Sequence, residues 1–171
     1  MILGLLVVLV SSPIALTWYI HKHTSHNSFP IGMKAPSFVV STINGTTFSL
    51  GYNGKKQIII FFTAECSSCR DELSNLNKLY EQYKTKVNFF AISMSQLENT
   101  KILMSSQKIP FSVFLWTRTA SQDSLKISDV PTLLFVDEQR IIRNEYIGNR
   151  ALTEDKTLIQ SFCEEPFTQK R

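Results

Sequence analysis

Cysteine is scarce in this sequence, and its scarcity limits what the thiols can do. Only three of the 171 residues are cysteine, which is too few for the disulfide framework of a small secreted domain. Cys66 and Cys69 form a Cys-x-x-Cys pair, and Cys163 stands apart from them. The count therefore predicts one redox pair and one leftover thiol.

Histidine is equally scarce, and its placement argues against a metal site at the cysteine pair. A zinc site there would need two further ligands. The three histidines are His21, His23 and His26, far upstream of Cys66. We predict no metal and no other cofactor.

Clustered positive charge is also missing. The formal net charge is +4, but Lys55-Lys56 is the only adjacent basic pair before the last two residues. Nucleic-acid binding needs a basic stripe or patch, so we expect no nucleic-acid partner.

Hydrophobic residues make up 43% of the chain and charged residues 19%, which is enough apolar material for a packed core.

Charged side chains are absent from residues 1–20. A helix needs about 20 mostly apolar residues to span a membrane, so this run is interpreted as an uncleaved anchor. A cleaved signal peptide is the alternative, although the usual basic start and small-residue cleavage site are missing, and a buried core helix is a third interpretation. By the positive-inside rule, Lys22 after the run would favour a cytoplasmic location for the part of the chain that follows it. The predicted division is an anchor or signal peptide at 1–20, a linker at 21–29, a domain at 30–165 and a tail at 166–171.

An apolar run leads directly into the cysteine pair, and an amphipathic segment follows it. Together with similar segments further along, this predicts an α/β fold with a mixed central sheet and helices on both faces. Asn44-Gly45 predicts a two-residue hairpin turn near the N-terminus, and Thr153 is expected to cap the last helix. The expected strands are 38–42, 46–50, 57–63, 87–94, 111–116, 131–137 and 140–147, and the expected helices 66–83, 97–108, a short one at 119–127, and 153 onward.

The cysteine pair falls where the strand ends and the helix begins. A helix N-terminus presents unpaired N–H groups and the positive end of the helix dipole, and both stabilise a thiolate. Cys66 is therefore the candidate nucleophile, and Cys69, one turn later, is the candidate resolving thiol. Two unreactive buried thiols are the alternative, but that does not explain the strand–CxxC–helix context.

Two segments together resemble a known family. The run from Phe61 to Leu73, with the pair Cys66 and Cys69, and the later run from Val130 to Asp137 are similar to the thioredoxin superfamily, and more narrowly to TlpA/ResA-type membrane-anchored thiol–disulfide oxidoreductases. The entry around Ile31–Phe38 and the long interval before Pro131 resemble that family's N-terminal hairpin extension and central insertion.

The resemblance implies a function and further site residues. Val130-Pro131 would form a cis-proline loop that pairs with a partner peptide, and Glu72 would occupy the position of an active-site glutamate. The partners would be exported cysteine proteins such as apocytochrome c, with an upstream membrane electron donor and the protein acting as a reductase. The location would be the bacterial inner (cytoplasmic) membrane, with the domain facing the periplasm or cell exterior. The plainer interpretations are an edge-strand proline at Pro131 and an exposed helix glutamate at Glu72.

The sequence departs from that family at the cysteines. Glu65 stands near where a tryptophan usually precedes the first cysteine, and Ser67-Ser68 replaces the common proline between the cysteines. Like-charge repulsion from Glu65 is expected to disfavour the Cys66 thiolate, whereas the serine hydroxyls could hydrogen-bond it, so the sequence leaves the direction of electron flow open. Cys163 falls on an apolar helix face, where core packing is expected.

Three other functions fit the sequence less well. A peroxiredoxin-like peroxidase fits Thr63-x-x-Cys66 but lacks the proline its active site needs. A copper chaperone of the Sco type needs three residues between its cysteines and a downstream histidine. A non-enzymatic thioredoxin-like interaction module is disfavoured by the intact cysteine pair and Pro131.

Overall fold

A single mixed sheet organises the chain in the computed structural model, which describes residues 29–117, 127 and 129–164. Within these ranges the strand order is β2-β1-β5-β4-β3-β6-β7. The predicted anchor at 1–20, the tail at 166–171 and nearly all of the linker lie outside the described residues. The elements in chain order are β1 (Val39–Ser41), β2 (Thr47–Ser49), β3 (Lys56–Phe62), α2 (Ser67–Tyr83), β4 (Val87–Ser93), α3 (Leu97–Gln107), β5 (Ser112–Trp116), β6 (Thr132–Val136), β7 (Ile142–Ile147) and α4 (Leu152–Glu164).

The central strand β3 leads to the cysteines. Every residue of β3 is buried, as its continuous apolar run predicts. It pairs in parallel with β4 and antiparallel with β6, and β6 pairs antiparallel with β7. The predicted parallel strands around the cysteine helix and the antiparallel hairpin after Pro131 are therefore confirmed.

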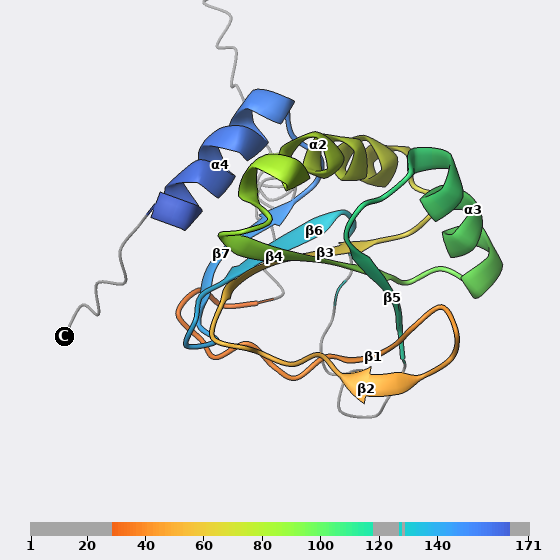
Figure 1. The fold of residues 1–171 in the computed structure, drawn as a ribbon, viewed down its shortest axis with the longest axis horizontal. Helices are drawn as coiled ribbons and strands as arrows, with labels where there is room; N and C mark the ends of the chain where they lie inside the picture. The colour runs from red at the N-terminus through yellow and green to blue at the C-terminus, as the bar shows by residue number, and fades with distance from the viewer. Residues whose placement is uncertain (1–28, 118–126, 128, 165–171) are drawn as a thin grey trace, which may run out of the picture.

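The two faces of the sheet are covered differently. Helices α2 and α4 lie together above it, with α3 beside them (Figure 1), and residues such as Leu76, Leu103 and Ile159 from all three helices share one core with β3. On the opposite face, the segment that precedes β1 packs against the sheet in a core that includes Phe29 and Phe38. Helices were predicted on both faces; the described helices lie on one face, and the short helix predicted at 119–127 lies almost entirely outside the described residues.

The N-terminal extension differs in two details from the sequence prediction. Phe29, assigned to the linker, is fully buried and stacks on Phe61 at 6.1 Å between ring centroids, so it belongs to the domain. The hairpin loop has three residues rather than two, because Thr42 N–H donates to the Thr46 carbonyl and Gly45 N–H to the Thr42 carbonyl. Gly45 has φ +88° while Asn44 does not enter the left-handed region, which is the geometry of a turn closed by a glycine bulge.

The last helix begins one residue earlier than predicted. It starts at Leu152, so Thr153 lies inside the first turn and is not the cap. The Glu154 carboxylate instead accepts a hydrogen bond from Ala151 N–H, which satisfies one of the free donors at the helix start. The predicted acidic residues of the first turn, Glu154 and Asp155, are where the sequence placed them.

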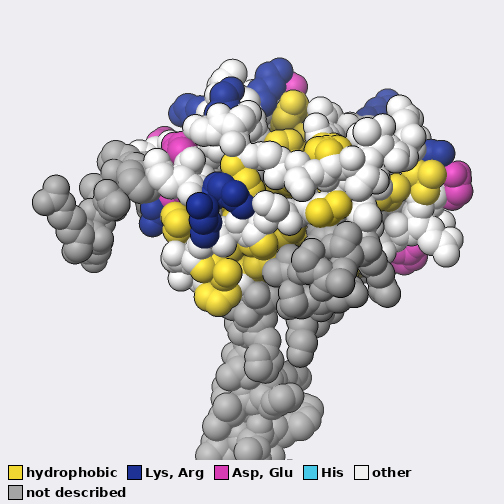
Figure 2. Space-filling model, turned by 90° about the horizontal axis from the view of Figure 1, so that it is seen from below, with side chains coloured by type: hydrophobic (Ala, Val, Ile, Leu, Met, Phe, Trp, Pro, Cys, Tyr) yellow, Lys and Arg dark blue, Asp and Glu magenta, His cyan; other side chains and the backbone are white. Residues whose placement is uncertain are grey.

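The surface shows no single basic stripe on the side seen from below. Lys and Arg side chains lie in separate places on the face in Figure 2. Among the described residues, no helix is both long and apolar enough to cross a membrane.

Candidate active site

Cys66 is the N-cap of α2. Its backbone is extended, with φ −79° and ψ 120°, and its sulfur accepts a hydrogen bond from Cys69 N–H at 3.2 Å. The Ser68 hydroxyl lies 3.3 Å from the same sulfur. A sulfur therefore occupies the position where a cap oxygen usually accepts from the first turn, and these donors stabilise its anionic form.

The two thiols of the pair have opposite acidities. Burial raises the pKa of the half-buried Cys66 thiol, but hydrogen bonds from Cys69 and Ser68 outweigh burial, so that its pKa is lowered overall. Cys69 is fully buried; burial, followed by its hydrogen bond with Cys66, raises its pKa to about 12. At neutral pH one thiol is prepared to ionise and the other holds its proton, which is the division expected of nucleophile and resolving thiol.

The proline loop lies against the first cysteine. The Val130–Pro131 peptide bond is cis, as the family resemblance implied. The Cys66 thiol donates to the Val130 carbonyl at 3.8 Å, and Pro131 then leads into β6, which pairs with β3. The sheet thus brings together two segments that are 64 residues apart in the chain.

Glu72 is the third predicted site residue, and it is fully buried. The plainer interpretation of an exposed helix glutamate is therefore wrong. Its carboxylate accepts from Arg150 Nη2 at 2.9 Å and from Arg150 backbone N–H at 3.0 Å, and Arg150 also pairs with Asp155 at 3.0 Å. Burial raises the pKa of Glu72 to about 7, although Arg150 pulls it down. A carboxyl with a pKa near neutrality lies one helical turn after Cys69.

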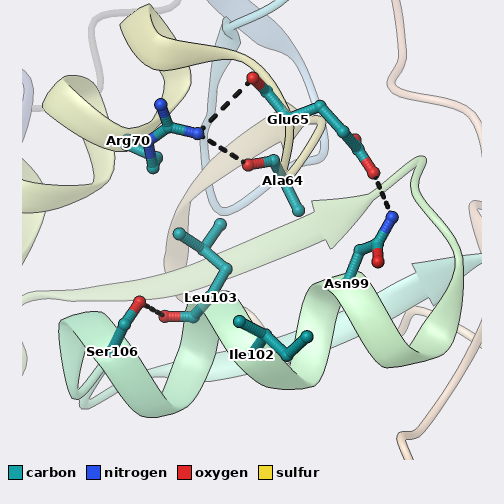
Figure 3. A pocket seen from close by; sticks show the side chains of 7 residues that line it. All are labelled: Ala64, Glu65, Arg70, Asn99, Ile102, Leu103 and Ser106. Carbon is teal, nitrogen blue, oxygen red and sulfur yellow. Dashed lines mark hydrogen bonds between the residues drawn. The ribbon is translucent and has the colours of Figure 1, made fainter.

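Two groups of residues around this site were not found from the sequence. Arg150 belongs to a loop 78 residues after Glu72, and no local pattern links the two. Ser95 and Asn99 contact Glu65 from the segment after β4 and from α3, beside a hollow that Arg70 and Ile102 also line (Figure 3). Only the folded sheet, which places the ends of β3 and β4 side by side, reveals these contacts.

Cys163 lies apart from the pair, on α4. It is half-buried and packs against the helical core, as predicted, and burial raises its pKa. Within the described ranges, no group of three His, Cys, Asp or Glu side chains could hold a metal ion.

Comparisons with known proteins identify the family and the fold. A model of the AhpC/TSA family matches residues 31–145. The thioredoxin-like protein YneN of Bacillus subtilis is 24% identical over 80% of this chain and 84% of its own, and the thiol-disulfide oxidoreductase ResA of Bacillus cereus is 24% identical over 85% and 86%. The crystal structure of the thioredoxin domain of a Bacteroides vulgatus thiol-disulfide oxidoreductase superimposes with a TM-score of 0.66 at 22% identity, covering 77% of this chain and 99% of that domain. The fold is therefore thioredoxin-like, as the resemblance implied.

Proposed function

This chain belongs to the AhpC/TSA family and is a thiol–disulfide oxidoreductase of the ResA type, and we propose that it reduces the disulfides of exported proteins with Cys66 and Cys69. The observation that carries this proposal is the placement of the two thiols: Cys66 Sγ caps α2 and accepts from Cys69 N–H at 3.2 Å, whereas Cys69 is fully buried, and their pKa values shift in opposite directions. A structural pair of thiols has no need of such a difference in pKa. Disulfide exchange needs one thiol ionised for attack and the other still protonated until the mixed disulfide has formed.

The reaction follows from these two positions. The Cys66 thiolate attacks one sulfur of the partner's disulfide, and the partner's other sulfur leaves as a thiolate that takes up a proton. Cys69 then loses its proton and attacks Cys66 Sγ, which releases the partner's second thiol. Two electrons and two protons pass to the partner, and the chain is left with a Cys66–Cys69 disulfide.

Formation of the mixed disulfide prepares the second step. Two of the causes that raise the Cys69 pKa come from Cys66, namely its hydrogen bond and its charge. Both disappear once Cys66 Sγ is bonded to the partner, so the Cys69 pKa falls when its thiolate is needed. Glu72, on the same helix with a pKa near neutrality, is proposed as the group that tunes or accepts the Cys69 proton.

The loop at Val130-Pro131 is proposed as the partner-binding element. It lies against the Cys66 thiol, so an extended peptide that presents a disulfide to Cys66 would run beside the backbone of Val130. Peptide recognition by backbone pairing suits many sequences, which fits a protein that acts on several cysteine-containing partners.

The setting of the reaction is also part of the proposal. The charge-free run of residues 1–20 would anchor the chain in the bacterial inner membrane, with the domain facing the periplasm or cell exterior. Exported proteins such as apocytochrome c would be the substrates, and a membrane electron donor would reduce the Cys66–Cys69 disulfide again. Disulfide chemistry belongs in such oxidising compartments, which supports this placement.

A redox titration of the full chain in detergent, with thiol and disulfide buffers, tests the proposal. A reduction potential of about −270 mV would support a reductase, and one of about −120 mV an oxidase. Cys69→Ser should accumulate a mixed disulfide with a cysteine-containing peptide, Cys66→Ser should not, and Cys163→Ser should behave as wild type. Absence of any Cys66–Cys69 disulfide over this range would contradict the proposal, and rapid consumption of hydrogen peroxide would favour the peroxidase alternative.

A further inference from the structure

The carboxylate of Glu65 is bound by the segment after β4 and by α3, although its backbone precedes Cys66 directly. Ser95 Oγ donates to Oε2 at 2.5 Å, and Asn99 Nδ2 donates to Oε1 at 2.5 Å. Figure 3 shows the Glu65 side chain extended towards Asn99, while its backbone carbonyl points to Arg70. Both carboxylate oxygens are thus occupied by donors that belong to another part of the chain.

The backbone of the same turn is held from both sides. Ser95 Oγ, while donating to Glu65, accepts from Ala64 N–H at 2.8 Å. Arg70 Nη1 donates to the Ala64 and Glu65 carbonyls at 3.1 and 3.4 Å. The turn before the nucleophile is therefore held by Ser95 of the segment after β4, by Asn99 of α3 and by Arg70 of α2.

This arrangement answers the expectation that Glu65 would oppose ionisation of Cys66. The Cys66 pKa is lowered, and its largest causes are burial and the hydrogen bonds of Cys69 and Ser68, not the neighbouring carboxylate. The hydrogen bonds of Ser95 and then Asn99 lower the pKa of Glu65 itself, so the side chain remains an anion near neutral pH. The negative charge is present but directed towards α3.

We propose that Ser95, just before α3, and Asn99, on α3, are positioning residues for disulfide exchange, which hold the Glu65 carboxylate away from the Cys66 thiolate. The inference rests on the proposed function, because it concerns how that nucleophile stays ionised. It also explains how the chain can carry a carboxylate near the position where the family usually has tryptophan.

A double-mutant cycle on the full chain tests the inference, with the Cys66 pKa measured by the ultraviolet absorbance of its thiolate. All variants carry Cys163→Ser, so that the third thiol does not contribute. Asn99→Ala frees one oxygen of Glu65, and we expect the Cys66 pKa to rise by about half a unit, the effect of a like charge at partly screened distance. Glu65→Gln alone should change this pKa by less, and Asn99→Ala should have no further effect in the Glu65→Gln background.

The cycle separates the charge from any structural effect. If Asn99→Ala raised the Cys66 pKa equally with glutamine at position 65, the effect would come from the shape of the turn, and the inference would be wrong. It would also be wrong if Asn99→Ala left the pKa unchanged. Ser106→Ala, in the same hollow without contact to Glu65, and Glu98→Gln, which removes another charge of α3, are the matched controls and should leave the pKa unchanged.

Failure of the inference can be told from failure of the proposed function. The thiolate titration needs no partner and no disulfide. If the chain exchanges disulfides but shows no coupling between positions 65 and 99, the proposed function stands and this inference is wrong. A chain that shows the coupling but forms no Cys66–Cys69 disulfide keeps the positioning geometry and contradicts the proposed oxidoreductase mechanism.

Discussion

Two glutamates stand on either side of the cysteine pair, and the fold treats them in opposite ways. Glu65, just before Cys66, is exposed, and hydrogen bonds from Ser95 and Asn99 lower its pKa. Glu72, one turn after Cys69, is fully buried, and burial raises its pKa to about 7. The exposed carboxyl of Glu65 therefore stays charged at neutral pH, whereas the buried carboxyl of Glu72 has a pKa near neutral pH.

The difference shows that neighbours in space decide the role of an acidic residue. Glu65 lies before the helix, where donors from α3 and solvent both stabilise its charge. Glu72 is buried on α2, where its counterion among the described residues is Arg150. The first can be a fixed anion and the second a proton carrier, although both are glutamates within seven residues of each other in the sequence.

The largest expected effect comes from removing the counterion of the buried Glu72 carboxylate. Arg150→Met keeps the length and apolar stem of the side chain but leaves Glu72 and Asp155 without the guanidinium that pairs with both. Breaking a buried ion pair on one side costs about 3–5 kcal/mol, and urea unfolding at neutral pH should show a loss of this size.

An exposed ion pair provides the control for that substitution. Lys101→Met breaks the pair between Lys101 and Glu98 on α3, whose side chains are 44% and 74% exposed. Exposed pairs contribute about 0–1 kcal/mol, so this variant should unfold near the wild-type urea concentration. Equal losses in the two variants would contradict the contrast between buried and exposed carboxylates.

Glu72→Gln tests the raised pKa and should give the next largest effect. In the folded chain Glu72 keeps its proton up to about pH 7, whereas the unfolded chain loses it near the ordinary value of 4.5. Its contribution to stability is therefore fully present below pH 4.5 and is lost as the pH rises through 7, by about 1–3 kcal/mol. Glutamine mimics the neutral carboxyl, so the fall should be absent in Glu72→Gln and retained in Glu98→Gln, as measured by urea unfolding between pH 4.5 and 8.

Ser68→Ala should have a smaller effect, on the nucleophile itself. The Ser68 hydroxyl lies 3.3 Å from Cys66 Sγ and is among the causes that lower the pKa of this thiol. Its loss should raise the Cys66 pKa by up to about one unit, the value of a single hydrogen bond. Ser67→Ala, an exposed serine beside it, is the control, and thiolate absorbance is the measurement. A rise in both variants would point to the helix start rather than to the Ser68 hydroxyl.

The sequence predicted the sheet and the cysteine pair well, because both depend on local pattern. The apolar run of β3, the strand-to-helix turn at Cys66 and the proline before β6 are all visible within short windows. The surroundings of the two glutamates were not predictable in the same way. Arg150 reaches Glu72 across 78 residues, and Asn99 reaches Glu65 across 34, so the interpretations of Glu72 as exposed and of Glu65 as opposing Cys66 lacked the contacts that determine them.

Glu65→Gln should have the smallest effect on stability. Its effect should change with pH in the direction opposite to that of Glu72→Gln. A lowered pKa means that the contribution of Glu65 is present above the ordinary carboxyl range and is lost as the pH falls through its folded value. Because the side chain is exposed, solvent and salt screen most of this contribution. Melting temperatures between pH 7 and 3 should fall slightly less for Glu65→Gln than for wild type, with the difference reduced in high salt. If the differences for Glu65→Gln and Glu72→Gln instead changed in the same direction with pH, the two carboxyls would not occupy opposite environments, and the contrast drawn from their burial and hydrogen bonds would fail.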